Sequence, residues 1–450
     1  MSKKVIRLIT LVIAIAMIAT LAVGCGGDNA ASTSSGSSST DNTTSGGNKN
    51  ESAPGNAFLE NPEDYRGTKV VYVTWKDPWK NEDGDACDAF MAEYGIQMEA
   101  QLIGQGDYVQ TIAASIASDT QGDIFFENGD FPGSLTVMQP LDAARLNLED
   151  PIWNQALIKA STLEGHPYLV DAISNVWTEV DICVYNKELF AQRNIPTPDQ
   201  YYAADKWTFE NFKWCATEIS KLGKGYMGAS ILGEVALGAA GCASFTFADN
   251  QMKVTVDDKY RKVFNYLAQM NADGVMKLDR SSFGNGKDGM ALTNCFGLKK
   301  TGYYTKINPD HLGATFIPKW DENSTHTVTG IYRGWGLIDG AKNPVGAGFF
   351  LREYLDVNNY KLDKTFHNTE VANFFFQVTG QYSDAMIYYH GPDMVKTTGM
   401  GVRFDEQWAY QTPANTNSYI DSQLNLMQTM CDRANEIIDK ERAWIKQTYK

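Results

Sequence analysis

The sequence predicts an α/β protein folded as two lobes, and three observations lead to this prediction. A strand, a helix and a second strand follow one another at the start of the folded part, over Lys69–Thr74, Tyr108–Ser118 and Ile124–Phe126. Such a β-α-β succession is typical of a parallel sheet covered by helices. About 390 residues remain once a polar N-terminal segment is set aside, more than a single compact core usually holds. Hydrophobic residues make up 43% and charged residues 21% of the chain, as in an ordinary globular protein.

The hydrophobic pattern justifies the elements of this first unit. KVVYVT at Lys69–Thr74 is a short run of mostly apolar, β-branched residues, which is typical of a buried strand. In the helix, Val109, Ile112, Ala113 and Ile116 recur at the spacing that places them on one face. The two strands are therefore expected to lie in one parallel sheet.

Further elements follow along the chain, and no internal repeat is visible. A long extended run is expected at 175–185, and Thr208 is expected to cap a helix that continues to Leu222. The remaining predictions are a helix at Asp257–Asn271, a strand at Gly313–Ile317, a helix at Val345–Leu355 and a long C-terminal helix at Ile420–Tyr449.

The N-terminus has the pattern of an export signal, predicted here to span residues 1–24. Three cationic residues precede an apolar run from Leu8 to Val23, which is shorter than the roughly 20 residues that span a bilayer. The run ends in Ala22-Val23-Gly24-Cys25, which resembles the lipobox of bacterial lipoproteins, although Ala22 stands where leucine is usual. The resemblance implies cleavage before Cys25 and lipidation of its thiol. An ordinary membrane anchor and a soluble secreted protein are the alternatives.

Residues 25–57 are predicted to form a lipidated tether. Apart from Cys25, nearly all of them are Ser, Thr, Gly, Asn, Asp or Ala, a composition that cannot bury apolar surface and favours disorder. Such a segment has a mean reach of roughly 30 Å. The folded part is therefore expected to stay close to a cell membrane, outside the cytoplasm.

Charge and cysteine content exclude several classes of partner and site. The formal net charge is −15, and loss of the three cations of the signal leaves −18, which argues against nucleic acid as a partner. Besides Cys25 there are six widely spaced cysteines without a C-x-x-C pair, so neither a zinc site nor a dense disulfide framework is indicated. Buried single thiols are expected, with no metal and no cofactor.

A series of short motifs in a fixed order then resembles a known family. The series comprises Gly122-Asp123-Ile124, Pro140-Leu141-Asp142, Gly165-His166-Pro167-Tyr168, Tyr185-Asn186-Lys187-Glu188-Leu189-Phe190, Ile195-Pro196-Thr197-Pro198, Lys206-Trp207-Thr208-Phe209-Glu210, Phe283-Gly284-Asn285-Gly286-Lys287, Ile317-Pro318-Lys319 and Gly336-Leu337-Ile338. Its order and gaps resemble the extracellular solute-binding proteins (family 1) of bacterial carbohydrate ABC importers, the family that includes maltose-binding protein. The resemblance covers residues 65–355.

The resemblance implies a periplasmic-binding-protein-like fold with a hinge and a ligand cleft between its lobes. It assigns 58–180 plus 314–358 to lobe I and 181–313 plus 359–450 to lobe II. It also implies a monomeric, non-catalytic receptor that binds a carbohydrate and docks on the permease subunits of an ABC transporter.

Candidate ligand-binding residues follow the first two strands. Sugar sites combine carboxylates and amides with aromatic faces, and ligands of open α/β sheets bind beyond the carboxyl ends of the strands. Trp75, Asp77 and Trp79 come directly after the first strand, where a capped surface turn is the alternative. Glu127 and Asp130 come after the second strand, and the resemblance implies sugar contacts for both; a helix N-cap by Asp130 is the alternative.

The other candidates lie near the expected lobe crossings and in lobe II. Trp177 and Glu179 precede the hinge, where the resemblance implies a ligand-binding carboxylate and a hinge salt bridge is the alternative. Arg333 and Trp335 stand where the chain returns to lobe I, and the glycines on either side of Trp335 suit a backbone close to a ligand. A core tryptophan is the alternative there. Tyr382 and Trp408 are further candidates in lobe II.

Other functions have less support from the sequence. No P-loop, EF-hand loop, G-x-S-x-G or H-E-x-x-H motif occurs, and the histidines are isolated. The acidic and aromatic candidates leave a receptor for a peptide or polyamine as the alternative. A glycoside hydrolase is a remote alternative, since it requires two carboxyl groups about 5 to 9.5 Å apart across the scissile bond.

Overall fold

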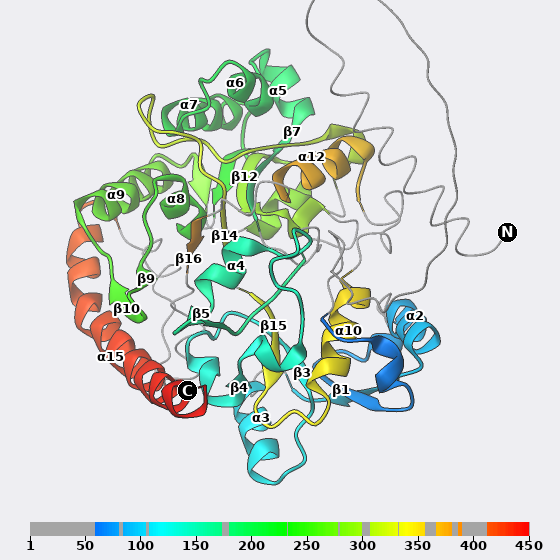
Figure 1. Ribbon diagram of the computed structural model, residues 1–450. Coiled ribbons are helices and arrows are strands. Elements are labelled where there is room, and N and C mark those ends of the chain that lie inside the picture. The colour runs from blue at the N-terminus through cyan, green and yellow to red at the C-terminus, as the bar shows by residue number, and fades with distance from the viewer. Residues whose placement is uncertain are drawn as a thin grey trace, which may run out of the picture. The chain divides into compact units, whose positions relative to one another are not determined.

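Two five-stranded sheets organise the protein, and the first is built on strand β1 (Figure 1). The computed structural model describes residues 59–80, 84–104, 108–172, 180–231, 233–277, 280–298, 307–331, 333–355, 366–379, 386–388 and 412–449. The first sheet has the order β2 (Gln97–Leu102), β1 (Lys69–Thr74), β3 (Ile124–Glu127), β15 (Gly334–Ile338) and β4 (Met138–Gln139). Strands β2 and β3 pair with β1 in parallel, whereas β15 runs antiparallel to both β3 and β4.

The predicted β-α-β unit is present, but it contains a further helix and strand. Helix α3 (Tyr108–Ala117) and strands β1 and β3 lie where the sequence predicts them. Between β1 and α3 the chain also forms α2 (Gly84–Tyr94) and β2, which the hydrophobic pattern did not indicate. Strand β2 is an edge strand in which only Met98 is buried, so its sequence lacks the apolar run of a central strand.

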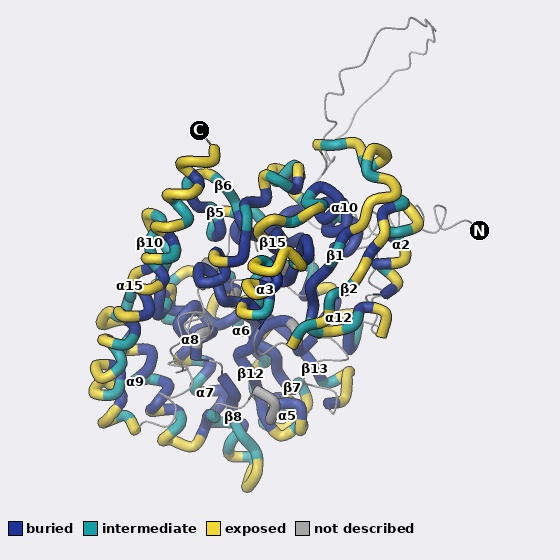
Figure 2. Tube along the Cα trace, turned by 90° about the horizontal axis from the view of Figure 1, so that it is seen from below, coloured by how far each residue is buried: buried dark blue, intermediate teal, exposed yellow. Residues whose placement is uncertain are grey.

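The second sheet is more deeply buried than the first. Its order is β11 (Met276–Lys277), β8 (Met227–Ile231), β12 (Asp288–Asn294), β7 (Asp181–Asn186) and β13 (Leu312–Thr315). Every residue of β7 and β12 is buried, and in Figure 2 the tube is dark blue along both strands. Strand β13 falls within two residues of the predicted strand at Gly313–Ile317.

Helices pack against both sheets. Beside the second sheet lie α5 (Lys187–Arg193), α6 (Pro198–Ala203), α7 (Phe209–Ser220), α8 (Gly233–Ala239), α9 (Asp258–Ala272) and α12 (Thr369–Thr379). Beside the first lie α2, α3, α4 (Gln155–Ala160) and α10 (Pro344–Tyr354). Thr208 caps α7 as predicted, since its Oγ1 accepts a hydrogen bond from the backbone N–H of Asn211 at 3.3 Å. Helices α9 and α10 agree with the predictions within one residue at each end.

The C-terminal helix α15 (Thr416–Thr448) contacts elements that lie beside each of the two sheets (Figure 1). Near its start, Asp421 forms an ion pair with Arg261 of α9 at 2.8 Å. Near its end, Arg442 pairs with Glu164 at 2.5 Å, and Glu441 accepts a hydrogen bond from the hydroxyl of Tyr168 at 2.5 Å. Its middle packs on the hairpin of β9 (Phe245–Ala248) and β10 (Gln251–Val254). The helix therefore contacts segments that the sequence assigned to different lobes.

Short strand pairs complete the described part of the chain. Strand β14 (Thr329–Ile331) pairs in parallel with β16 (Met386–Tyr388), and β5 (Thr162–Leu163) pairs with β6 (His166–Pro167). The hydroxyl of Thr329 donates a buried hydrogen bond of 2.6 Å to a carboxylate oxygen of Asp181, which ties β14 to the start of β7.

The six cysteines of the described residues are all buried single thiols, as the sequence predicts. No helix within the described ranges has the length and apolar character needed to cross a bilayer. The predicted signal and tether lie outside the described residues.

Candidate functional site

Three segments that carry candidate residues end at the same edge of the first sheet. In the parallel pair of β1 and β3, Tyr72 stands opposite Ile124 and Val73 opposite Phe125, so both strands point their carboxyl ends to this edge. Strand β15 enters from the same edge because it is antiparallel, with Gly334 opposite Glu127. The structure thus brings together Trp75 after β1, Glu127 at the end of β3 and Arg333 before β15. This edge is where ligands of open α/β sheets bind.

Glu127 shapes the turn that follows β3. Its side chain is 1% exposed, and its two carboxylate oxygens accept hydrogen bonds from the backbone N–H groups of Gly129 at 2.9 Å and Asp130 at 2.5 Å. Hydrogen bonds from N–H groups to a charged acceptor offset the cost of burying the charge. Gly129 has φ of +95°, a conformation that favours glycine. The carboxylate therefore holds the backbone of this turn in place.

Asp130 belongs to the same buried turn and lies two residues before the N-cap position of the next helix. The following 3-10 helix spans Gly133–Val137 and has Pro132 at its N-cap position. The backbone carbonyl of Asp130 accepts hydrogen bonds from the N–H groups of Gly133 at 2.8 Å and Ser134 at 3.3 Å. Pro132, and not Asp130, therefore holds the N-cap position of this helix, and a ligand contact by Asp130 stays a prediction.

Trp75 lies on an aromatic base at the end of β1. Its partly buried ring meets Tyr108 edge-on with a centroid distance of 5.2 Å and is tilted against Phe126 at 6.1 Å. The hydroxyl of Tyr108 donates to the carbonyl of Val73 at 2.6 Å, and burial raises the pKa of Tyr108, so the phenol stays neutral. Tyr108 and Phe126 thus position Trp75, and neither was singled out from the sequence, where each reads as an ordinary apolar residue of its element.

Asp77 and Trp79 have intramolecular partners that fit a capped surface turn. One carboxylate oxygen of Asp77 accepts a hydrogen bond from the N–H of Trp79 at 3.1 Å, and the other pairs with Lys80 at 3.2 Å. The indole N–H of Trp79 donates to Asp88 of α2 at 3.0 Å, while 42% of the residue remains exposed. Ligand contacts by Asp77 and Trp79 stay a prediction.

Trp335 lies in the hydrophobic core, which was the alternative to a ligand-binding role for this residue. The residue is 1% exposed, and its ring packs against Tyr72 at 5.2 Å, Phe126 at 5.3 Å and Tyr354 at 5.1 Å. In this conformation Trp335 supports the site from beneath through Phe126. Arg333, two residues earlier, is partly exposed at the sheet edge.

The remaining candidates lie outside the described residues: Cys25, Trp177, Glu179, Tyr382 and Trp408. Within the described ranges, no three His, Cys, Asp or Glu side chains converge as a metal site. What the edge offers chemically is a set of hydrogen-bond acceptors from Asp77, Glu127 and Asp130, a guanidinium donor from Arg333, and the indole of Trp75. Such a set can bind a polyhydroxylated ligand.

Solved structures with a similar fold include proteins described as sugar-binding or as extracellular solute-binding proteins. A cyclic alpha-maltosyl-1,6-maltose binding protein from Arthrobacter globiformis matches with a TM-score of 0.57 at 16% identity, over 83% of this chain and 99% of its own. The sugar-binding protein MalE from the phytopathogen Xanthomonas citri matches with a TM-score of 0.57 at 14% identity, over 85% and 100%. An extracellular solute-binding protein from Staphylococcus aureus, in complex with maltose, matches with 0.53 at 16% identity, over 86% and 100%.

These matches establish the fold. The predicted class, α/β with the two-lobe architecture of periplasmic binding proteins, is confirmed by their coverage of both chains. No protein-family model matches the sequence, and no curated protein matches it.

Proposed function

We propose that this chain is an extracellular receptor that captures a carbohydrate, in particular an oligosaccharide, and delivers it to the permease of an ABC transporter. One observation carries the proposal: Trp75, Glu127 and Asp130 meet at the carboxyl edge of the first sheet, beside Arg333 at the start of β15. The ligand class is supported by the structural neighbours, which are a cyclic maltosyl-maltose binding protein, a sugar-binding protein and a protein in complex with maltose.

The chemistry of this edge suits sugar hydroxyls. The partly exposed indole of Trp75 offers a face for the C–H surface of a sugar ring. Glu127 holds the turn after β3 through the backbone N–H groups of Gly129 and Asp130, and a carboxylate is an acceptor suited to sugar hydroxyls. Arg333 supplies donors to the hydroxyl oxygens, and hydrogen bonds to charged groups are stronger than neutral ones. Asp77 and Trp79 would line the rim of the site.

We assign 58–180 to lobe I and 181–313 plus 359–450 to lobe II, with the ligand between them. Of the segment 314–358, the part through Trp320 packs with the second sheet and β15 lies in the first, so we place the return to lobe I between Trp320 and β15. The hydrogen bond between Thr329 and Asp181 and the pairing of β14 with β16 lie where the chain passes between these segments, which supports a hinge there. Trp177, Glu179, Tyr382 and Trp408 would complete the cleft. Closure requires the ligand to bind the closed state more tightly than the open one.

The export signal at 1–24 and the polar segment at 25–57 support anchoring at the cell membrane through lipid on Cys25. The receptor would act as a monomer without catalysis. A polyamine or peptide is the second candidate ligand, because three carboxylates and only one guanidinium come from the candidate residues at the edge.

Calorimetric titration of residues 58–450 with a panel of oligosaccharides, peptides and polyamines tests this proposal. Micromolar or tighter binding to one glycan class is expected, and Trp75→Ala should weaken it. Trp214→Ala is the matched control, since Trp214 is 42% exposed on α7 and lies outside the proposed site. Ligand at 100 times Kd should also add about 2.7 kcal/mol to the free energy of unfolding. Binding of peptides or polyamines instead of glycans would discard the carbohydrate and keep the receptor.

A further inference from the structure

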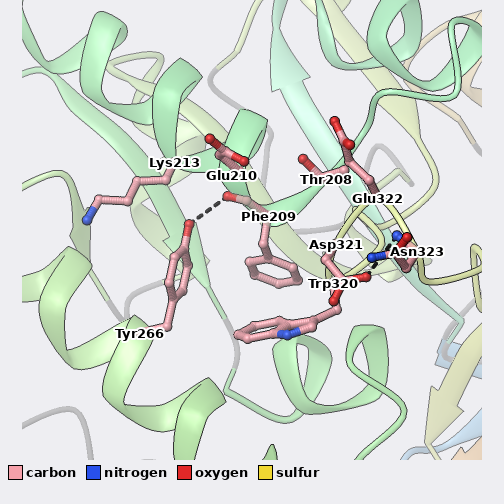
Figure 3. Close-up of a pocket in the computed structure, with 9 residues that line it drawn as sticks. All are labelled: Thr208, Phe209, Glu210, Lys213, Tyr266, Trp320, Asp321, Glu322 and Asn323. Carbon is pink, nitrogen blue, oxygen red and sulfur yellow. Dashed lines mark hydrogen bonds between the residues drawn. The ribbon is translucent and has the colours of Figure 1, made fainter.

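A second concave site lies beside the second sheet and shares no residue with the proposed sugar site. It is formed by the start of α7, by Tyr266 of α9 and by the loop after β13 (Figure 3). Its volume is about 460 Å³, within the range of small-molecule sites. The lining residues are Thr208, Phe209, Glu210, Lys213, Tyr266, Trp320, Asp321, Glu322 and Asn323.

Three aromatic rings make up one wall of this pocket and hold one another in place. Trp320 packs against Phe209 at 5.4 Å and against Tyr266 at 5.7 Å, and Phe209 meets Tyr266 edge-on at 5.9 Å. The hydroxyl of Tyr266 donates to the carbonyl of Phe209 at 2.6 Å, the dashed contact on the left of Figure 3. Burial raises the pKa of Tyr266, so this donor stays neutral. The wall is therefore formed without a ligand.

Carboxylates line the pocket beside these rings. Asp321 accepts hydrogen bonds from the N–H of Asn323 at 3.0 Å and the hydroxyl of Ser324 at 2.8 Å, which fix the loop. Glu210 and Glu322 are exposed, and neither forms a hydrogen bond or ion pair with another residue of the described ranges. The pocket thus contains two negatively charged hydrogen-bond acceptors that make no hydrogen bond or ion pair within the described part of the chain.

The protein places one of its own cations against this wall. The ammonium nitrogen of Lys213 lies 5.8 Å from the centroid of the Tyr266 ring, within the distance of a cation–π contact. The same ammonium is 2.7 Å from a carboxylate oxygen of Asp273, outside the pocket. Asp273 therefore balances the charge of Lys213. A second cation, Lys259, contributes to a lowered pKa of Asp321, so three carboxylates face one further positive charge and the pocket keeps an excess of negative charge.

We propose that this pocket binds an organic cation, with an ammonium or guanidinium group among Glu210, Asp321 and Glu322 and its alkyl part against Trp320. Aromatic faces attract cations through the ring quadrupole, and the carboxylates add charge-assisted hydrogen bonds. The same charges repel anions, and a neutral ligand lacks the charge–charge attraction that a cation has. The inference does not rest on the proposed sugar site, because no residue is shared.

The test is 19F NMR of the full chain labelled with 5-fluorotryptophan, in which Trp320→Phe identifies the resonance of Trp320. Butylammonium and butylguanidinium chloride are the two probes, and 1-butanol is the neutral control of similar size. At least one cation should shift the Trp320 resonance saturably, more weakly at high salt, and comparison of the two shows which headgroup is preferred. The resonance of Trp214, which lies on α7 but outside the pocket, should not move.

Charge-neutral variants separate this role from packing. The double variant Glu210→Gln, Glu322→Gln should weaken binding of the cation roughly tenfold, because it removes two negative charges from the pocket. Both side chains are exposed, so the stability of the fold should change little. Glu436→Gln, an exposed carboxylate on α15, is the matched control and should leave the affinity unchanged. The proposal is overturned if neither cation shifts Trp320, if 1-butanol or a neutral oligosaccharide shifts it equally, or if the double variant binds as the parent does.

Discussion

The buried carboxylate of Glu127 offers a sharp test of how the candidate site is held together. Glu127→Gln keeps the size of the side chain but replaces one acceptor oxygen by an NH2 group. In the parent, the two oxygens accept N–H groups of Gly129 and Asp130 at 2.9 and 2.5 Å. The amide can accept one of these and meets the other with a donor, which leaves a backbone N–H in a 1% exposed environment without its partner.

The expected loss of stability in Glu127→Gln follows from these two hydrogen bonds. A hydrogen bond to a charged group contributes about 1.5–3 kcal/mol, and a buried donor left without a partner costs about 1–3 kcal/mol. Burial of a neutral amide costs less than burial of a carboxylate and offsets part of the loss. We therefore expect Glu127→Gln to lower the free energy of unfolding by about 2 kcal/mol at neutral pH.

Urea unfolding monitored by circular dichroism measures this change. Glu99→Gln is the matched control: Glu99 pairs with Lys69 at 2.7 Å, but both side chains are more than half exposed, so the loss should stay within about 0.5 kcal/mol. Ligand affinity is measured on the same variants. If Glu127→Gln unfolds at the same urea concentration as the parent yet loses ligand affinity, Glu127 acts as a direct ligand contact and the turn-holding argument is refuted.

Three further predictions concern the fold. Gly228→Ala should lower the free energy of unfolding in urea by about 1–3 kcal/mol or more, because the added Cβ would lie 2.1 Å from a backbone oxygen of α7. In the control Gly104→Ala no atom lies within 4 Å of the added Cβ, so the free energy of unfolding should change by less than about 1 kcal/mol. Burial lowers the pKa of His326 in the fold, so as the pH falls below about 6.5 the unfolded state binds the proton before the folded state does. Protonation therefore favours unfolding, and Tm should fall between about pH 7 and pH 5.5. The fall in Tm should be smaller in His326→Gln. Burial raises the pKa of Glu441, so its charged form is disfavoured in the fold. Glu441→Gln removes this charge and should raise Tm at about pH 7. The gain in Tm should vanish toward about pH 4, where the carboxyl group is protonated in both states.

The sequence predicted the elements whose pattern is strong and local. Apolar periodicity located α9 and α10 within a residue, and the hydroxyl of Thr208 gave the start of α7. It did not indicate β2, whose register opposite β1 is set by the sheet while most of its side chains remain accessible. Nor could a local pattern show that α15 packs on elements near both sheets, because its apolar stripe specifies a buried face but not the partners.

For the site, the sequence indicated which segments meet but not how their side chains point. The rule that ligands bind beyond the carboxyl ends of strands predicted that Trp75 and Glu127 lie at one edge of the sheet. The parallel pairing of β1 with β3 places them there. Which carboxylate oxygens the backbone already uses depends on turn geometry, and no spacing reveals it. The pocket at Trp320 and Tyr266 was missed because its rings come from two helices and a loop that are more than fifty residues apart.

The glycines beside Trp335 illustrate how one sequence signal can have two physical causes. In the sequence they suit a backbone that a ligand approaches closely, but a Cβ at Gly334 would lie 2.7 Å from Leu157, and one at Gly336 would lie 2.3 Å from Met138. Core side chains already fill the space beside β15, and a side chain at either glycine would have to displace them. That packing holds the Trp335 ring against Phe126, on which Trp75 rests in turn. A side chain added at Gly336 would therefore disturb the site through this stack of rings, without any contact to the ligand.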